Sequence, residues 1–161
     1  EQGVATARHV AQARIIADKK IALFRTYLYT PGTLYVTPTV VDECARIRCV
    51  ERRELHDSFI SVLIAEWQIE EPDQVEKRAR QLLSIHSGEH DCQILAEAEH
   101  AGFHALLTYD SALLNHFRNV DSSVLLERPS EYWEHLAIPR GARLDMIPHP
   151  TNPLSSEDWW R

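Results

Sequence analysis

The sequence predicts an α/β fold of three layers, α/β/α, in which helices cover both faces of a parallel central sheet. Short apolar runs rich in strand-forming residues recur along the chain, and segments with helical periodicity separate them. Parallel strands require such crossover connections, so this alternation favours a parallel sheet. The composition supports a packed core, because 44% of the residues are hydrophobic and only 5 are glycine.

The first part of the chain carries clear helix boundaries. Apolar residues at helical spacing predict a helix over residues 4–28, and a Pro-Gly turn ends it. Thr37 followed by Pro38 resembles an N-cap with a first-turn proline, so a second helix should run from there to about Arg48. Four apolar side chains are expected on its buried side: Val40, Val41, Cys44 and Ile47.

The remaining elements follow from the same kinds of signal. Helical periodicity, first-turn prolines and the terminal glycine Gly102 predict helices at residues 51–63, 72–86, 90–101, 111–118 and 129–136. Strands are expected between the helices, at residues 34–36, 64–69, 105–108 and 124–126.

The domain organisation is expected to be one domain over residues 1–138 and an extended tail over residues 139–161. The tail holds four of the eight prolines and ends in Trp159-Trp160. Because tryptophan buries a large apolar area, we expect these residues and Trp133 to act as packing anchors on the body or on a partner.

Composition limits where the chain works and what it binds. No apolar run approaches the roughly 18 residues that a membrane span needs, and no signal peptide is visible, so we expect no membrane contact. Three cysteines without a Cys-x-x-Cys pair fit a reducing compartment, which predicts a cytoplasmic protein. The formal charge of −7 argues against tight, non-specific binding to nucleic acid, but a carboxylate metal site is compatible with it.

Three carboxylates occupy the places where parallel sheets gather functional groups. Glu43 is on the helix that follows the first strand, Asp91 is on the helix before strand 105–108, and Asp110 comes just after that strand. Carboxylates brought together would repel one another, and a hard divalent cation such as Mg²⁺ relieves that repulsion. The pattern therefore predicts metal-assisted phosphoryl chemistry.

These segments also resemble a known family, the PIN-domain nucleases. Residues 34–43 (LYVTPTVVDE) look like the strand and helix that carry the second acid of the family, and residues 90–98 (HDCQILAEA) look like its third-acid helix. Residues 106–110 (LLTYD) are similar to its Thr-x-Asp strand end. The last strand with the following Pro-Ser-Glu-Tyr is similar to its final strand and short helix, so the resemblance covers about residues 4–137.

The resemblance implies a function that composition alone does not. PIN domains are Mg²⁺- or Mn²⁺-dependent nucleases that mostly act on RNA, and many bacterial members are dimeric toxins of type II toxin–antitoxin pairs. The resemblance thus implies an endoribonuclease with RNA as substrate, an antitoxin protein as partner and a homodimer. Glu43, Asp91 and Asp110 would be the catalytic, metal-binding set, and Thr108 would support these ligands. Asp42 takes the place of Glu43 if the helix is turned by one residue.

One departure from the family pattern affects the functional prediction. The family begins with a strand that ends in an Asp, its first acid, and these residues contain no counterpart. The first residue is Glu1 and the only methionine is Met146, so we expect the natural chain to include an upstream strand. If nothing precedes Glu1, the first acid is missing, and the alternative is a catalytically inactive PIN-like module that binds RNA or protein.

Other polar residues admit a second interpretation. Arg46 and Arg52 belong to a basic cluster that is either a solvated helix face or a contact for the RNA backbone. His86 and His90 are four residues apart, but the break at Gly88 argues against a zinc site. Glu97 and His100 have a Glu-x-x-His spacing, and without a second copy both are expected to face solvent.

Overall fold

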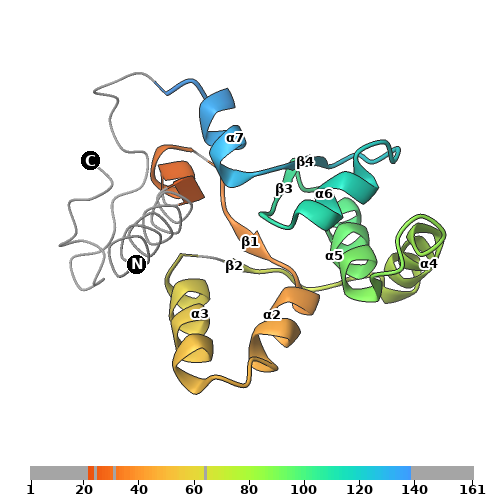
Figure 1. Ribbon diagram of the computed structural model, residues 1–161, viewed down its shortest axis with the longest axis horizontal. Helices are drawn as coiled ribbons and strands as arrows, with labels where there is room; N and C mark the ends of the chain where they lie inside the picture. The colour runs from red at the N-terminus through yellow and green to blue at the C-terminus, as the bar shows by residue number, and fades with distance from the viewer. Residues whose placement is uncertain (1–21, 24, 31, 64, 139–161) are drawn as a thin grey trace, which may run out of the picture. The chain divides into compact units, whose positions relative to one another are not determined.

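The structure, a computed structural model, describes residues 22–23, 25–30, 32–63 and 65–138 (Figure 1). The chain divides into two units, which we call the central unit, Thr33–Arg128, and the terminal unit, Glu1–Gly32 with Pro129–Arg161. The predicted tail over residues 139–161 and most of the predicted helix over residues 4–28 lie outside the described residues.

The central unit is a mixed α/β structure, as the alternating sequence pattern predicted. In chain order its elements are β1 (Tyr35–Val36), α2 (Pro38–Ala45), α3 (Val50–Leu63), β2 (Ala65–Glu66), α4 (Pro72–Leu82), α5 (Glu89–His100), β3 (Ala105–Leu107), α6 (Ser111–Phe117) and β4 (Leu125–Glu127). Every predicted strand and helix of this unit is present, with boundaries that differ by a few residues.

The strands of the central unit pair in parallel. β1 pairs with β2, with Tyr35 opposite Ala65, and β3 pairs with β4, with Ala105 opposite Leu125. Helices α2 and α3 connect the first pair and α6 connects the second, as parallel pairing requires. Among the described residues these pairs form two separate two-stranded sheets. One continuous central sheet with three layers therefore stays a prediction.

Proline and glycine set several helix ends where the sequence predicted them. Pro38 and Pro72 begin α2 and α4, because a proline at the first helical position lacks only an N–H that would have no partner in the helix. Gly102 follows α5 with φ of 67°, a left-handed conformation that glycine adopts without strain. The α2 helix ends at Ala45 and α4 ends at Leu82, so each is shorter than predicted.

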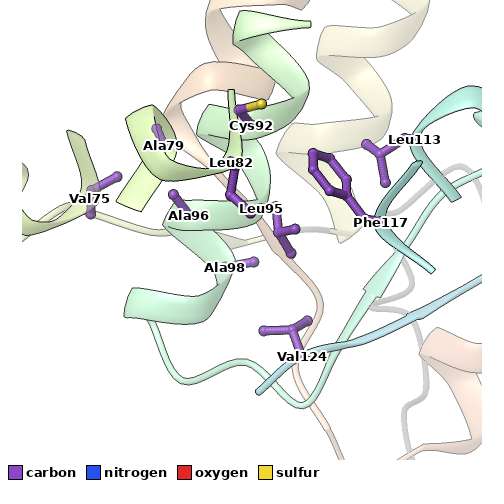
Figure 2. Packing of buried hydrophobic residues seen from close by; sticks show 10 residues of the cluster. All are labelled: Val75, Ala79, Leu82, Cys92, Leu95, Ala96, Ala98, Leu113, Phe117 and Val124. Atoms are coloured by element: carbon purple, nitrogen blue, oxygen red, sulfur yellow. The ribbon is translucent and has the colours of Figure 1, made fainter. Parts of the chain in front are cut away.

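The hydrophobic core of the central unit lies between α4, α5 and α6 (Figure 2). Helix α4 lies alongside α5 and contributes side chains at helical spacing, and α6 and the start of β4 close the core (Figure 1). The buried cluster consists of Val75, Ala79, Leu82, Cys92, Leu95, Ala96, Ala98, Leu113, Phe117 and Val124. Cys92 is therefore a packing group, as expected from how often free cysteine is buried.

Helix α2 is held outside this core, which corrects one expectation. The four apolar residues predicted as its buried side are each only half-buried, and Ile47 lies beyond the end of α2. Helix α2 contains no fully buried residue. Helix α2 packs on α3 and on α5. Its position must consequently depend more on polar contacts than on apolar burial.

The terminal unit is described over a shorter stretch. Residues 22–23 and 25–29 are helical, and α7 (Pro129–His135) follows the last strand. The ring of Trp133 lies 5.6 Å from the ring of Tyr29, and the Arg25 guanidinium lies 5.8 Å from the Trp133 ring centre. Trp133 is thus a packing anchor, as predicted, whereas Trp159 and Trp160 lie outside the described residues.

Within the part of the chain that the structure describes, no helix has both the length and the apolar character that crossing a bilayer requires.

Candidate functional site

Two of the predicted site carboxylates lie at the N-terminal turn of α5. The Oε1 atom of Glu43 lies 2.8 Å from Nδ1 of His90, and Asp91 is the next residue of α5. The Oδ2 atom of Asp91 lies 2.6 Å from Nε2 of His86, in the loop that precedes the helix. The fold therefore brings a carboxylate from α2 to the residue beside Asp91, and each of these two acids has a histidine partner.

The His86 ring is fixed by its neighbours. It stacks on His116 at 4.4 Å between ring centres and meets the edge of Phe117 at 5.3 Å, and its side chain is only 10% exposed. The Cys92 thiol donates a hydrogen bond to the backbone carbonyl of His86 at 3.2 Å. Because the ring and the backbone are both held, the nitrogen that faces Asp91 has little freedom to move.

Asp110 has a structural task at the start of α6. Its Oδ1 accepts hydrogen bonds from the backbone N–H groups of Ala112 at 2.7 Å and Leu113 at 3.1 Å, which makes it the N-cap of the helix. The backbone N–H of Asp110 in turn donates to Oγ1 of Thr108 at 3.0 Å. The side chain of Thr108 thus holds the backbone of Asp110. The support of metal ligands by Thr108 stays a prediction.

Glu43 is the carboxylate of α2 that contacts α5. Asp42, the alternative considered from the sequence, is exposed. The guanidinium of Arg46, the C-cap residue of α2, lies 3.4 Å from Nε2 of His90, at the edge of the site. Arg52 is exposed on α3. Of the two arginines considered for RNA contact, Arg46 is the one that touches a site residue.

Glu97 does not face solvent, and this corrects the prediction made from its charge. Its side chain is buried, with 1% of the residue exposed. Its oxygens accept hydrogen bonds from the Thr39 hydroxyl at 2.6 Å, the Thr39 backbone N–H at 3.3 Å and the Gln93 amide at 3.2 Å. The burial of a carboxylate is tolerated because Thr39 of α2 and Gln93 of α5 provide these donors.

A signal for the burial of Glu97 was present in the sequence. It stands in an otherwise small and apolar run, Ile94-Leu95-Ala96-Glu97-Ala98, on a helix that is covered on several sides. A charged residue in the middle of such a run indicates either a position that is locally exposed to solvent or a buried group with hydrogen-bonding partners. Thr39, four residues before Glu43, was the available partner.

The thiols beside the site are poor candidates for metal ligands. Burial raises the pKa of Cys92, and the negative charge of Asp91 raises it further. Burial also raises the pKa of Cys44, and the charges of Asp57 and Glu43 act in the same direction. Both cysteines therefore favour the protonated thiol, which neither binds metal nor attacks electrophiles readily.

The donors of the site suit a hard cation in kind, because carboxylate oxygens are the ligands that Mg²⁺ and Mn²⁺ prefer. Their arrangement is less complete. Among the residues that are described, no three His, Cys, Asp or Glu side chains form a group able to hold a metal ion. Glu43 of α2 contacts His90 in the first turn of α5, and Asp91 belongs to the same turn. The side chain of Asp110 instead accepts hydrogen bonds from the backbone of α6. The joint binding of metal by all three carboxylates stays a prediction.

No family model, curated protein or solved structure matches this chain. The resemblance to PIN domains therefore rests on the sequence segments described above.

Proposed function

We propose that this chain is a PIN-type endoribonuclease that depends on Mg²⁺ or Mn²⁺, with α/β/α layers and a site at the N-terminal turn of α5. The observation that carries the proposal is the contact of Glu43 with His90, two residues that are 47 positions apart in the sequence. This contact puts the carboxylate of α2 against the residue that precedes Asp91 in α5. Carboxylates that face one another repel, and a cation between them would relieve that repulsion.

The chain's own residues would share the work as follows. Glu43 and Asp91 would hold the cation, and His90 and His86 would keep these carboxylates oriented. A divalent ion bound there supplies charge neutralisation and an activated water for phosphodiester hydrolysis. Asp110 would complete the acidic set from the start of α6.

Substrate and partners follow from the resemblance and from charge. Arg46 at the edge of the site would contact an RNA phosphate, and Arg52 on α3 would extend that contact. With a formal charge of −7, binding should depend on a few such cations and on the metal rather than on a broad basic surface. A cytoplasmic toxin with an antitoxin partner and a homodimeric state are part of the same proposal.

The test is RNA cleavage with Mn²⁺ or Mg²⁺ by wild-type protein and by Asp91→Asn and Glu43→Gln variants. We expect the cleavage activity of each variant to fall by more than roughly 10–100-fold, which is the usual loss when a group that supports a metal ligand is removed. Asp73→Asn is the matched control, since Asp73 is an exposed acid in the first turn of α4. Equal cleavage by Asp91→Asn, Asp73→Asn and wild type would rule the proposal out, as would cleavage that survives removal of metal by EDTA.

A second candidate function is a PIN-like module that binds RNA or protein without catalysis. It is favoured by one observation: Glu43, Asp91 and Asp110 each already have a hydrogen-bonding partner within the chain. This function predicts RNA binding that is independent of Mn²⁺ and leaves the RNA intact. Filter binding and gel analysis of the same RNA distinguish the two candidates.

A further inference from the structure

A polar seam joins α2 to α5, and its two ends have different environments. At one end Thr39 contacts Glu97, and at the other end Glu43 contacts His90. Thr39 and Glu43 are four residues apart and His90 and Glu97 are seven apart, so each pair occupies one face of its helix. Since the order of partners is reversed, the two helices run antiparallel across the seam.

The buried end of the seam completes the N-terminus of α2. The first N–H groups of any helix have no partner within it, and a side chain usually caps them. Thr37, the N-cap residue of α2, makes no side-chain capping bond, and the first turn of α2 contains no acidic residue. The carboxylate of Glu97 accepts a hydrogen bond from the Thr39 N–H instead. Its negative charge lies at the positive end of the α2 dipole, which is a favourable interaction.

This contact has few competitors in fixing α2. Helix α2 has no fully buried residue, so apolar packing does not define its rotation strongly. The Glu97 contact is both buried and directional, because one carboxylate binds a hydroxyl and a backbone N–H of the same residue. A rotation or shift of α2 would break these bonds.

We propose that Glu97 is a positioning residue that caps α2 from α5 and thereby holds Glu43 beside His90 and Asp91. The link of this placement to RNA cleavage rests on the proposed function, whereas the placement itself does not. The Glu97 oxygens contact Thr39 of α2 and Gln93 of α5, so the hold of Glu97 on α2 runs through Thr39.

The experiment compares three variants with wild type. Glu97→Gln keeps the size of the side chain but removes its charge and one acceptor oxygen. Thr39→Val removes the hydroxyl with a smaller risk to folding, and Thr39→Ser should restore wild-type behaviour because it keeps both donors. The control is Glu99→Gln, on the same helix, because the Glu99 carboxylate bonds to Arg78 of α4.

Three measurements separate positioning from general stability. Hydrogen exchange of the α2 amides should be about tenfold faster in Glu97→Gln, the effect expected from loss of a helix cap. The ¹⁵N shift of His90 Nδ1 should move towards its value in a Glu43→Gln variant. The affinity for Mn²⁺ should fall roughly 10–100-fold, as for loss of other groups that orient metal ligands. Glu99→Gln should lower the melting temperature without these three changes.

The possible results lead to distinct conclusions. Wild-type exchange in α2 and an unchanged His90 shift in Glu97→Gln would overturn the positioning role, and so would equal changes in Glu99→Gln. If the wild type neither binds Mn²⁺ nor cleaves RNA, the proposed function fails, while the exchange and the His90 shift still decide the position of α2. If both of these respond but Mn²⁺ affinity does not, the role of the placement in metal binding is refuted.

Discussion

The imidazole of His86 and the carboxylate of Asp91 lie 2.6 Å apart across Gly88. A Cβ atom added at Gly88 would stand 2.9 Å from Asp91 Oδ2 and in hard contact with His86 Nε2. The backbone of Gly88, with φ of −77°, is open to any residue, so the glycine is required by space and not by conformation. The absence of a side chain at Gly88 is thus what allows His86 to reach Asp91.

We predict that Gly88→Ala separates His86 from Asp91 and destabilises the protein by about 1–3 kcal/mol, the usual cost of overpacking. Urea denaturation measures the free energy of unfolding, and Mn²⁺ titration reports the effect on Asp91. Gly32→Ala is the control, because the nearest atom to its new Cβ is Thr30 Cγ2 at 3.6 Å, an ordinary contact. A Gly88→Ala protein as stable as the control would show that the contact can be rearranged freely.

Asp110 permits a test that distinguishes capping from chemistry. Asn caps helices about as well as Asp, so Asp110→Asn should melt within about 0.5 kcal/mol of wild type, whereas Asp110→Ala should lose about 1 kcal/mol. If Asp110 also serves catalysis, RNA cleavage falls in both variants. Thermal melting and cleavage assays on the same preparations provide the comparison. Full activity in Asp110→Asn would restrict Asp110 to capping α6.

The ion pair of Arg78 with Glu99 should contribute more to stability than an exposed pair. Its two bonds, of 2.6 Å and 2.9 Å, are partly buried, and donation of these hydrogen bonds to the Glu99 carboxylate raises the pKa of Arg78. We expect Glu99→Gln to cost about 1–2 kcal/mol. Glu76→Gln, which breaks the exposed pair of Glu76 with Arg80, should cost less than about 0.5 kcal/mol. Equal losses in urea denaturation would contradict this ranking.

The raised pKa of the Cys92 thiol leads us to predict that the folded protein loses stability in alkaline solution. Burial and the charge of Asp91 raise the pKa of its thiol in the folded protein. The unfolded chain therefore releases this proton first, near the ordinary thiol pKa of about 8.5. The contribution of Cys92 is complete below that pH and is lost as pH rises towards the folded pKa.

Replacing Cys92 should accordingly change the pH profile. The free energy of unfolding, measured between pH 7 and pH 10, should decline less steeply above about pH 8.5 in Cys92→Ala than in wild type. Cys49→Ala serves as the control, because Cys49 is exposed and should leave the slope unchanged. Parallel profiles for all three proteins would exclude the linkage.

Local chemistry explains why the elements of the central unit could be predicted. Pro38, Pro72 and Gly102 mark helix ends through their own backbone restrictions, so no knowledge of distant residues is needed. The strand segments were equally visible as apolar runs. Their pairing as β1 with β2 and β3 with β4 depends on how the helices pack, which no single segment contains.

The candidate site was predictable only in part for the same reason. Glu43 and Asp91 could be selected because each stands at a recognisable place after or before a strand. Their histidine partners could not, since His86 meets Asp91 only because the chain turns back at Gly88. The prediction that Glu97 faces solvent was wrong because it relied on the usual exposure of charged residues. Here the hydrogen bond from Thr39, on another helix, allows the carboxylate to be buried.

The aromatic neighbours of Trp67 give the central unit an optical reporter of its own. Trp67 is the single tryptophan of residues 33–128, and its ring lies 5.9 Å from Phe103 and 6.1 Å from His100. Its backbone N–H also donates a hydrogen bond to the carbonyl of Val36, which ties the backbone of Trp67 to β1. With the other tryptophans replaced by phenylalanine, emission from Trp67 would follow the opening of this unit independently of the chain's two ends.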